Sequence, residues 1–108
     1  GILGSQMRVF MESYDLLLTP TLPIAAFGAG LLSPADEGKS KWVYWTPFSY
    51  PFNLTQQPAA SVPCGFPKAG LPIGLHIVGK MFDDRTVLRA SQAYETATAW
   101  GEKRPKIK

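Results

Sequence analysis

The stretch from Thr46 to Phe66, which reads TPFSYPFNLTQQPAASVPCGF, restricts the possible folds of this chain more than any other segment. It is rich in aromatic residues and proline, and it contains no charged side chain. A loop in contact with water is seldom built this way, because charged and small polar residues dominate exposed segments. We therefore expect this stretch to lie against other parts of a folded protein, either as core packing or as the lining of a site.

A short helix is predicted near the beginning of this stretch. Thr46 suits the N-cap position, and Pro47 suits the first helical position. We expect the helix to cover residues 48–54 and to be kinked or tightened by Pro51. Pro58 prevents any long continuation of it.

A β-hairpin is predicted to follow. Residues 59–62 form a short apolar run that ends at Pro63, and residues 66–70 carry proline early and glycine late, as turns do. Residues 71–80 then alternate, as a strand with two distinct faces does. One face holds Leu71, Ile73, Leu75 and Ile77, and the other holds Pro72, Gly74, His76 and Val78. The second face is small, so we expect another segment to pack closely on it.

Two amphipathic helices flank this central region. In residues 3–14, apolar side chains recur with a helical period at Leu3, Met7, Phe10, Met11 and Tyr14. A second helix is predicted over residues 84–99, capped by Asp83 or Asp84. Its apolar stripe consists of Val87, Leu88, Ala90, Ser91, Tyr94 and Ala97.

Residues 16–19 form a short apolar run without alternation, which is typical of a strand buried on both faces in a parallel sheet. Pro20 and Pro23 end its pairing, and residues 24–40 read as a long connection. Three strands and three helices predict an α/β fold with a thin core. We therefore expect a sheet whose other strands lie elsewhere.

The net charge of +3 comes from the C-terminal sequence GEKRPKIK, residues 101–108, on an otherwise neutral body. A nucleic-acid-binding protein usually has a basic face within its fold, so we expect no nucleic-acid partner. No apolar run reaches the roughly 18–20 residues of a membrane span, so we expect no membrane insertion. The single cysteine excludes an intrachain disulfide and fits a reducing, cytoplasmic location.

Few side chains offer chemistry of their own. His76 could serve as a base for Cys64, but a lone histidine without a nearby acidic residue is more often structural. Cys64 is better explained as a small buried residue, and Ser61 as a buried hydroxyl bonded to the backbone. Too few suitable ligands are present for a zinc site.

Three blocks of the sequence resemble the C-terminal end of the amidase signature family. They are YDLLLTPTLP, TPFSYPFNLTQQPAASVPCGF and GLPIGLHIVGKMFDDRTVLRASQAYE, and the resemblance as a whole runs from about Gln6 to Trp100. The resemblance implies the C-terminal part of an α/β/α sandwich with a mixed sheet. Residues 1–108 would be a segment of one amidase-type domain, with 1–100 matching the family and 101–108 forming a basic tail. The resemblance also implies a reaction that cleaves or transfers a carboxylic amide and needs neither a cofactor nor a metal.

Chemistry in this family uses a nucleophilic serine, a second serine in a cis peptide bond and a lysine, with a Gly/Ser-rich loop supplying oxyanion donors. No such loop, and no lysine in a comparable context, is found in this chain. The resemblance therefore implies no catalytic residue here, and we expect the chain alone to be inactive. Its partners would be the N-terminal catalytic part of the same fold and a small amide substrate. Uncovered strand edges predict self-association.

The resemblance also suggests which residues line the acyl pocket. They lie at the end of the first strand and in the aromatic stretch: Thr19, Pro20, Thr21, Trp45, Phe48, Tyr50, Phe52 and Asn53. Together with Trp42, the aromatic residues favour a bulky or apolar acyl group. Gln56 stands where the family frequently has glycine, which argues against a left-handed helix end there. His76 stands where the family commonly has glutamine.

Three functions remain open at this point. The first is an amide hydrolase, of which this chain is the C-terminal portion. The second is an A-type subunit like that of glutamyl-tRNA amidotransferase, another member of the family. That protein holds glutamine with an aspartate shortly before its Asn-Leu segment, whereas this chain has no acidic residue between Glu37 and Asp83. The third is a noncatalytic interaction module.

Overall fold

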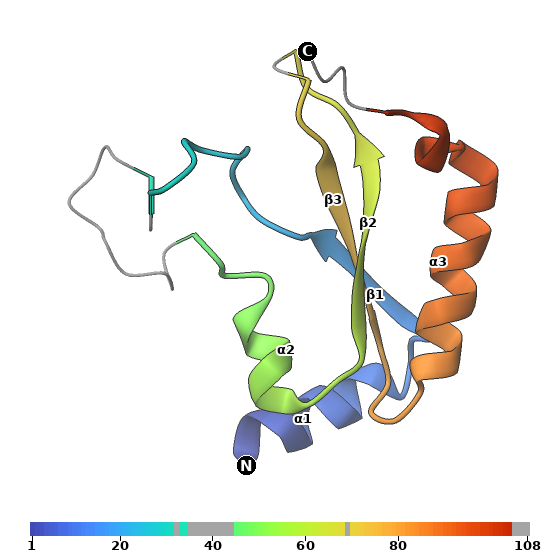
Figure 1. Cartoon of the computed structure of the whole chain (residues 1–108). Coiled ribbons are helices and arrows are strands. Elements are labelled where there is room, and N and C mark those ends of the chain that lie inside the picture. The colour runs from blue at the N-terminus through green and yellow to red at the C-terminus, as the bar shows by residue number, and fades with distance from the viewer. Residues whose placement is uncertain (32, 35–44, 69, 105–108) are drawn as a thin grey trace.

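The computed structural model describes residues 1–31, 33, 34, 45–68 and 70–104 (Figure 1). The elements are α1 (Ile2–Met11), β1 (Leu16–Pro20), α2 (Tyr50–Thr55), β2 (Ala59–Gly65), β3 (Ile73–Gly79), α3 (Asp84–Thr98) and a short 3₁₀ helix at Trp100–Glu102. The predicted α/β fold with three helices and three strands is confirmed. Trp42 and the polar half of the predicted connection, residues 35–40, lie outside the described residues.

β3 is the central strand of the sheet, which has the order β1-β3-β2. The predicted hairpin is confirmed, because β2 pairs antiparallel with β3, and Ser61 lies opposite His76. An irregularity between Pro63 and Gly65 shifts the register near the end of β2. The second strand of the hairpin is shorter than predicted and begins at Ile73.

The prediction for β1 was wrong in two respects. β1 pairs antiparallel with β3, and Thr19 lies opposite His76. It is an edge strand of the described sheet, and Leu18 is 57% exposed instead of being buried. A short run of leucines indicates only that the strand is apolar. Whether the strand runs parallel or antiparallel to its neighbour depends on β3, which lies far away in the sequence.

Helices cover both faces of the sheet. A Cβ atom added to Gly79 would lie 2.6 Å from Cγ2 of Val87, so α3 packs against the β3 backbone on that face. On the opposite face, the ring of Phe52 from α2 lies 5.5 Å from that of His76. Figure 1 shows α3 along one side of the strands and α2 on the other. Among the described residues, the buried hydrophobic side chains are Met11, Phe52, Ile77, Val78 and Val87.

The start of α2 differs from the prediction. The N-cap is Ser49, not Thr46, and Pro51 lies within the first turn, where it causes no kink. The Thr46 carbonyl instead accepts a hydrogen bond from the Ser49 amide at 3.2 Å, which makes a turn before the helix. The left-handed helix end, which the glutamine argued against, is present at Gln56, with φ 60° and ψ 35°.

The two flanking helices match their predictions to different degrees. α3 is confirmed, and the Thr86 amide donates a hydrogen bond to Oδ1 of the N-cap Asp83 at 3.2 Å. Leu88 is 67% exposed, so it does not belong to the buried stripe of α3. α1 ends at Met11 instead of residue 14, and Met11 is the only one of its predicted stripe that is fully buried.

The start of the basic tail contacts the fold. Nζ of Lys103 lies 4.7 Å from the ring centroid of Trp100 and 5.0 Å from that of Phe66. Both distances are within the range of cation–π attraction. Lys103 therefore bridges the end of α3 and the end of β2 through two aromatic rings.

Candidate functional site

A groove of about 500 Å³ lies beyond the end of β1. Its walls are the segment that leaves β1, the end of β2, and the residues that lead into β3. The lining residues are Thr21, Leu22, Pro23, Ile24, Ala25, Ala26, Ser61, Pro63, Pro67, Leu71, Pro72, Ile73 and Gly74. Among these, only Thr21 and Ser61 carry polar side chains, and none is charged. The groove is thus suited to an uncharged and largely apolar ligand.

Thr21 and Ser61 meet within this groove. The Thr21 amide donates a hydrogen bond to the Gly74 carbonyl at 2.9 Å, which continues the pairing of β1 with β3 past Pro20. This backbone position brings Oγ1 of Thr21 to 2.7 Å from Oγ of Ser61. The prediction that the Ser61 hydroxyl is buried and bonded to the backbone was therefore wrong: the residue is exposed, and its partner is a side chain.

Gly74 makes this meeting possible. A Cβ atom at position 74 would lie 2.5 Å from Oγ1 of Thr21 and 2.6 Å from Oγ of Ser61. Both distances are too short for a carbon and an oxygen that are not bonded. The central strand must therefore lack a side chain at this position for the two hydroxyls to meet above it.

A second group of contacts surrounds His76 on the same face of the sheet. Nδ1 of His76 lies 3.3 Å from Oγ1 of Thr19, and its ring contacts that of Phe52 edge to face. His76 is 6% exposed. Burial lowers the pKa of its imidazole from the ordinary value of 6.5, while a hydrogen bond with the main chain of Phe48 acts in the opposite direction. The ring is thus kept neutral, as suits a packed residue.

The arrangement offers no support for a Cys64–His76 pair. The residue opposite His76 on β2 is Ser61, and Cys64 lies at the irregularity of the strand. Cys64 is a free, half-buried thiol instead of a fully buried one. His76 is occupied by Thr19, Phe48 and Phe52, which is the environment of a structural histidine.

The residues predicted to line a pocket are distributed over several places. Thr21 lies in the groove, whereas Thr19, Phe48 and Phe52 surround His76. Pro20 is exposed and pairs with Leu75.

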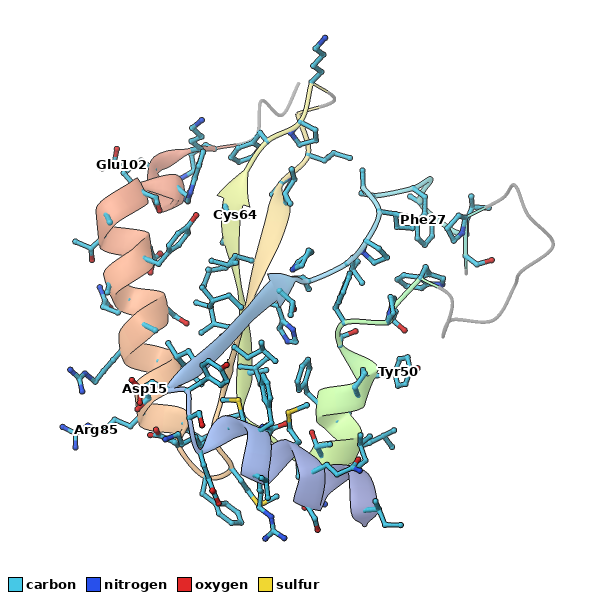
Figure 2. All side chains as sticks on the ribbon, turned by 180° about the vertical axis from the view of Figure 1, so that it is seen from behind. Asp15, Phe27, Tyr50, Cys64, Arg85 and Glu102 are labelled. Atoms are coloured by element: carbon cyan, nitrogen blue, oxygen red, sulfur yellow. The ribbon has the colours of Figure 1, made fainter. Side chains whose placement is uncertain are left out.

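The other predicted residues are not among those that line the groove. Trp45 packs edge to face on Phe27, with ring centroids 5.2 Å apart. Tyr50 lies on the side of α2 that is turned away from the sheet (Figure 2). Asn53 is exposed and lines a different cavity, together with Gln57 and Phe82.

Of the thirteen residues that line the groove, the sequence reasoning placed only Thr21 at a pocket, and the missed residues that matter most for the hydroxyl pair are Ser61 and Gly74. Ser61 and Gly74 line the groove, and neither was predicted to do so. Their signal is the alternation of the hairpin strands, which places Gly74 on the same face as His76. Ser61 reaches that face through the pairing of β2 with β3, whereas Thr21 reaches it through the pairing of β1 with β3, which the sequence does not reveal.

Two features of the described residues bear on metal binding and membrane insertion, namely the clustering of metal-ligating side chains and the length and apolarity of the helices. Among residues 1–31, 33, 34, 45–68 and 70–104, no group of three or more His, Cys, Asp or Glu side chains could hold a metal ion. None of the helices described here is both long and apolar enough to cross a membrane.

Comparison with known proteins agrees with the arrangement of these elements. A family model described as Amidase matches residues 2–88. The A-type subunit of the glutamyl-tRNA(Gln) amidotransferase from Brevibacillus brevis is 48% identical over 91 residues, which cover 83% of this chain and 18% of that protein. An acylamidase from Rhodococcus erythropolis is 38% identical over 109 residues, which cover 97% of this chain and 23% of that protein.

A solved structure has the same fold over most of the chain. The structure of 6-aminohexanoate cyclic dimer hydrolase matches with a TM-score of 0.81 and 26% identity, covering 95% of this chain and 23% of that one. The chain spans about a fifth of the length of the curated relatives it matches. The family model covers most of the chain, and the similar structures include an enzyme of the amidase signature family, so the chain belongs to that family.

Proposed function

We propose that the residues lining the groove form one wall of the substrate pocket in an amidase that hydrolyses carboxylic amides by serine-based acyl transfer. The observation that carries the proposal is the apolar groove beyond the end of β1, where Thr21 and Ser61 meet above Gly74. Ligands of α/β proteins commonly bind beyond the carboxyl ends of strands. A small, uncharged amide matches the composition of this groove.

The reacting groups would be supplied by the catalytic N-terminal part of the same fold. A serine there would attack the amide carbonyl, an acyl-enzyme would form as the amine leaves, and water would release the acid. Donors of a Gly/Ser-rich loop would stabilise the negative charge on the carbonyl oxygen. The chain, which spans about a fifth of the length of its relatives, would position the substrate without taking part in proton transfer.

A second candidate is the A-type component of a glutamyl-tRNA amidotransferase, because many of the similar proteins carry that name. Such a protein would have to bind glutamine, whose ammonium and carboxylate groups are costly to bury without partners. None of the described residues that line the groove has a charged side chain to supply them. This observation favours the hydrolase.

A third candidate is a noncatalytic interaction module. Large apolar side chains on several elements are exposed in the described structure, namely Ile2, Leu18, Leu54, Phe82 and Leu88. In the hydrolase, the catalytic part of the fold would cover much of this surface. In the isolated chain, the same surface and the open edges of β1 and β2 would favour self-association.

A cytoplasmic location is part of the proposal.

One experiment separates these candidates. The chain of residues 1–108 and the complete gene product that carries it are purified, and each is tested with an apolar anilide and with glutamine. The hydrolase predicts that only the complete product is active, with a preference for the anilide. Preference for glutamine would favour the amidotransferase. Inactivity of both preparations would favour the interaction module, and activity of the short chain would overturn the assignment of catalysis to another part of the fold.

A further inference from the structure

We infer that the hydroxyl pair of Thr21 and Ser61 is a specificity element that binds one uncharged oxygen atom of the substrate. This inference rests on the proposed function and extends it, because it names a chemical feature of the substrate. The favoured substrates are neutral amides whose apolar substituent carries an ether or carbonyl oxygen. This oxygen lies where the bound substituent passes the Thr21–Ser61 pair in the groove.

The hydrogen-bonding capacity of the pair is only partly used. Two hydroxyl groups have two protons to donate, and one of them is used in the 2.7 Å bond between Thr21 and Ser61. Among the described residues, neither hydroxyl makes a second hydrogen bond. The remaining proton is therefore available to a ligand. A hydroxyl that already accepts a hydrogen bond is also a better donor, because the two bonds polarise one another.

The surroundings of the pair determine what kind of ligand atom is accepted. All other lining side chains of the groove are apolar, and six of the thirteen lining residues are proline or alanine. A charged ligand atom would lose its hydration there without gaining an ionic partner. A neutral oxygen acceptor has a much smaller desolvation cost, and it would give the free hydroxyl proton a partner.

The backbone fixes the position of the pair. Thr21 is held by the bond from its amide to the Gly74 carbonyl, and Ser61 is held opposite His76 in the hairpin register. Gly74 leaves room above the central strand for both hydroxyls. Because both residues sit on paired strands or directly next to one, the donor stands at a fixed depth in the groove. It should consequently select for the position of the oxygen and not only for its presence.

The test measures kcat/KM of the complete gene product for two series of amides. In one series, hexanoyl anilide is compared with analogues in which an ether oxygen replaces, one at a time, the methylenes of the acyl chain from its third carbon onward, so that every analogue remains an amide. In the other, the same replacements are made in the amine chain of N-hexylbenzamide. We expect one analogue, in one of the two series, to be preferred over its all-methylene parent by roughly five- to tenfold, as one neutral hydrogen bond would give.

Variants assign this preference to the pair. The double variant Thr21→Val/Ser61→Ala removes both protons of the pair and should bring the ratio between the preferred analogue and its parent close to one. Each single variant leaves one hydroxyl whose proton is unused, so it should weaken the preference or move it to a neighbouring analogue. Thr21→Ser keeps the hydroxyl and should keep the preference. Thr96→Val removes a hydroxyl from the exposed face of α3 and serves as the matched control, for which the ratio should not change. The ratio is informative because a general loss of stability would lower both rates together.

The outcomes distinguish the inference from the function on which it rests. If the complete product hydrolyses none of the amides, the proposed function fails and the inference fails with it. If it hydrolyses them with a flat preference in the wild type, or with a preference that survives the double variant Thr21→Val/Ser61→Ala, the inference is overturned while the amidase function stands. A flat preference in the wild type overturns the inference even where a variant does not fold.

Discussion

The Cγ2 methyl group of Val87 lies where a side chain on Gly79 would project, only 2.6 Å from the position of a Cβ atom there. Val87 is 4% exposed and belongs to the first turn of α3, while Gly79 ends β3. The carbonyl of Asp83, the N-cap of α3, lies 3.3 Å from the same Cβ position. The helix is therefore seated directly on the strand backbone at its N-terminal end.

This contact predicts that Gly79→Ala destabilises the protein. The added methyl group must displace Val87 or shift α3, and overpacking of this kind costs about 1–3 kcal/mol. Urea unfolding followed by circular dichroism measures the change. Gly65→Ala is the matched control, because no heavy atom lies within 4 Å of its Cβ position. Equal losses in the two variants would contradict the close packing of α3 on Gly79.

Gln56 predicts a change in the opposite direction. It has φ 60° and ψ 35°, a left-handed conformation that glycine adopts more readily than glutamine. Gln56→Gly should increase the free energy of unfolding by about 1 kcal/mol, because it relieves this strain. Glu12→Gly is the control at another helix end, where φ is −59° and glycine should be neutral or destabilising. A loss of stability in Gln56→Gly would argue against strain at this position.

Local signals explain which parts of the fold were predictable. The hairpin and α3 follow from strict alternation, a turn with proline and glycine, and an aspartate cap, all of which act within a few residues. The beginning of α2 was predicted at Thr46-Pro47, but the N-cap is Ser49. The ring of Phe52 from this helix contacts His76, a residue far away in the sequence, and no local signal reports that contact. The direction of β1 depends in the same way on a distant partner.

The site was less predictable than the fold for the same reason. Thr21, which the resemblance to the amidase signature family suggested for the acyl pocket, lines the groove. Ser61 and Gly74 become site residues only through the register of three strands, in which Thr19, His76 and Ser61 align. The aromatic stretch supplies Phe48 and Phe52 to the surroundings of His76, whereas Trp45 packs on Phe27. The composition thus indicated that these rings are packed, but it did not identify the residues against which they pack.

His76 leads to a prediction about pH. Its pKa is lowered from 6.5, so the folded protein resists the proton that the unfolded chain accepts. The stability contributed by the neutral ring should be fully present above pH 6.5 and should be lost as the pH falls from there through the lower folded pKa. Because His76 is the only histidine in the sequence, NMR titration of its Cε1 proton can measure the pKa directly. In His76→Gln, this part of the pH dependence of unfolding should disappear. A measured pKa at or above 6.5 would contradict the burial of the ring.

Gly74 provides a test that separates folding from substrate binding. Gly74→Ala places a methyl group 2.5 Å from Oγ1 of Thr21 and 2.6 Å from Oγ of Ser61, so the two hydroxyls must move apart. Both side chains border the groove and can rotate into it, so the loss of stability should be modest, about 1 kcal/mol. The activity toward substrates that enter the groove should fall about tenfold, because the groove is both narrowed and deprived of its hydroxyl pair. Unfolding curves and kcat/KM of the complete gene product measure the two effects, with Gly65→Ala as control. If Gly74→Ala keeps wild-type kcat/KM for every amide that the complete product hydrolyses, the groove does not bind the substrate.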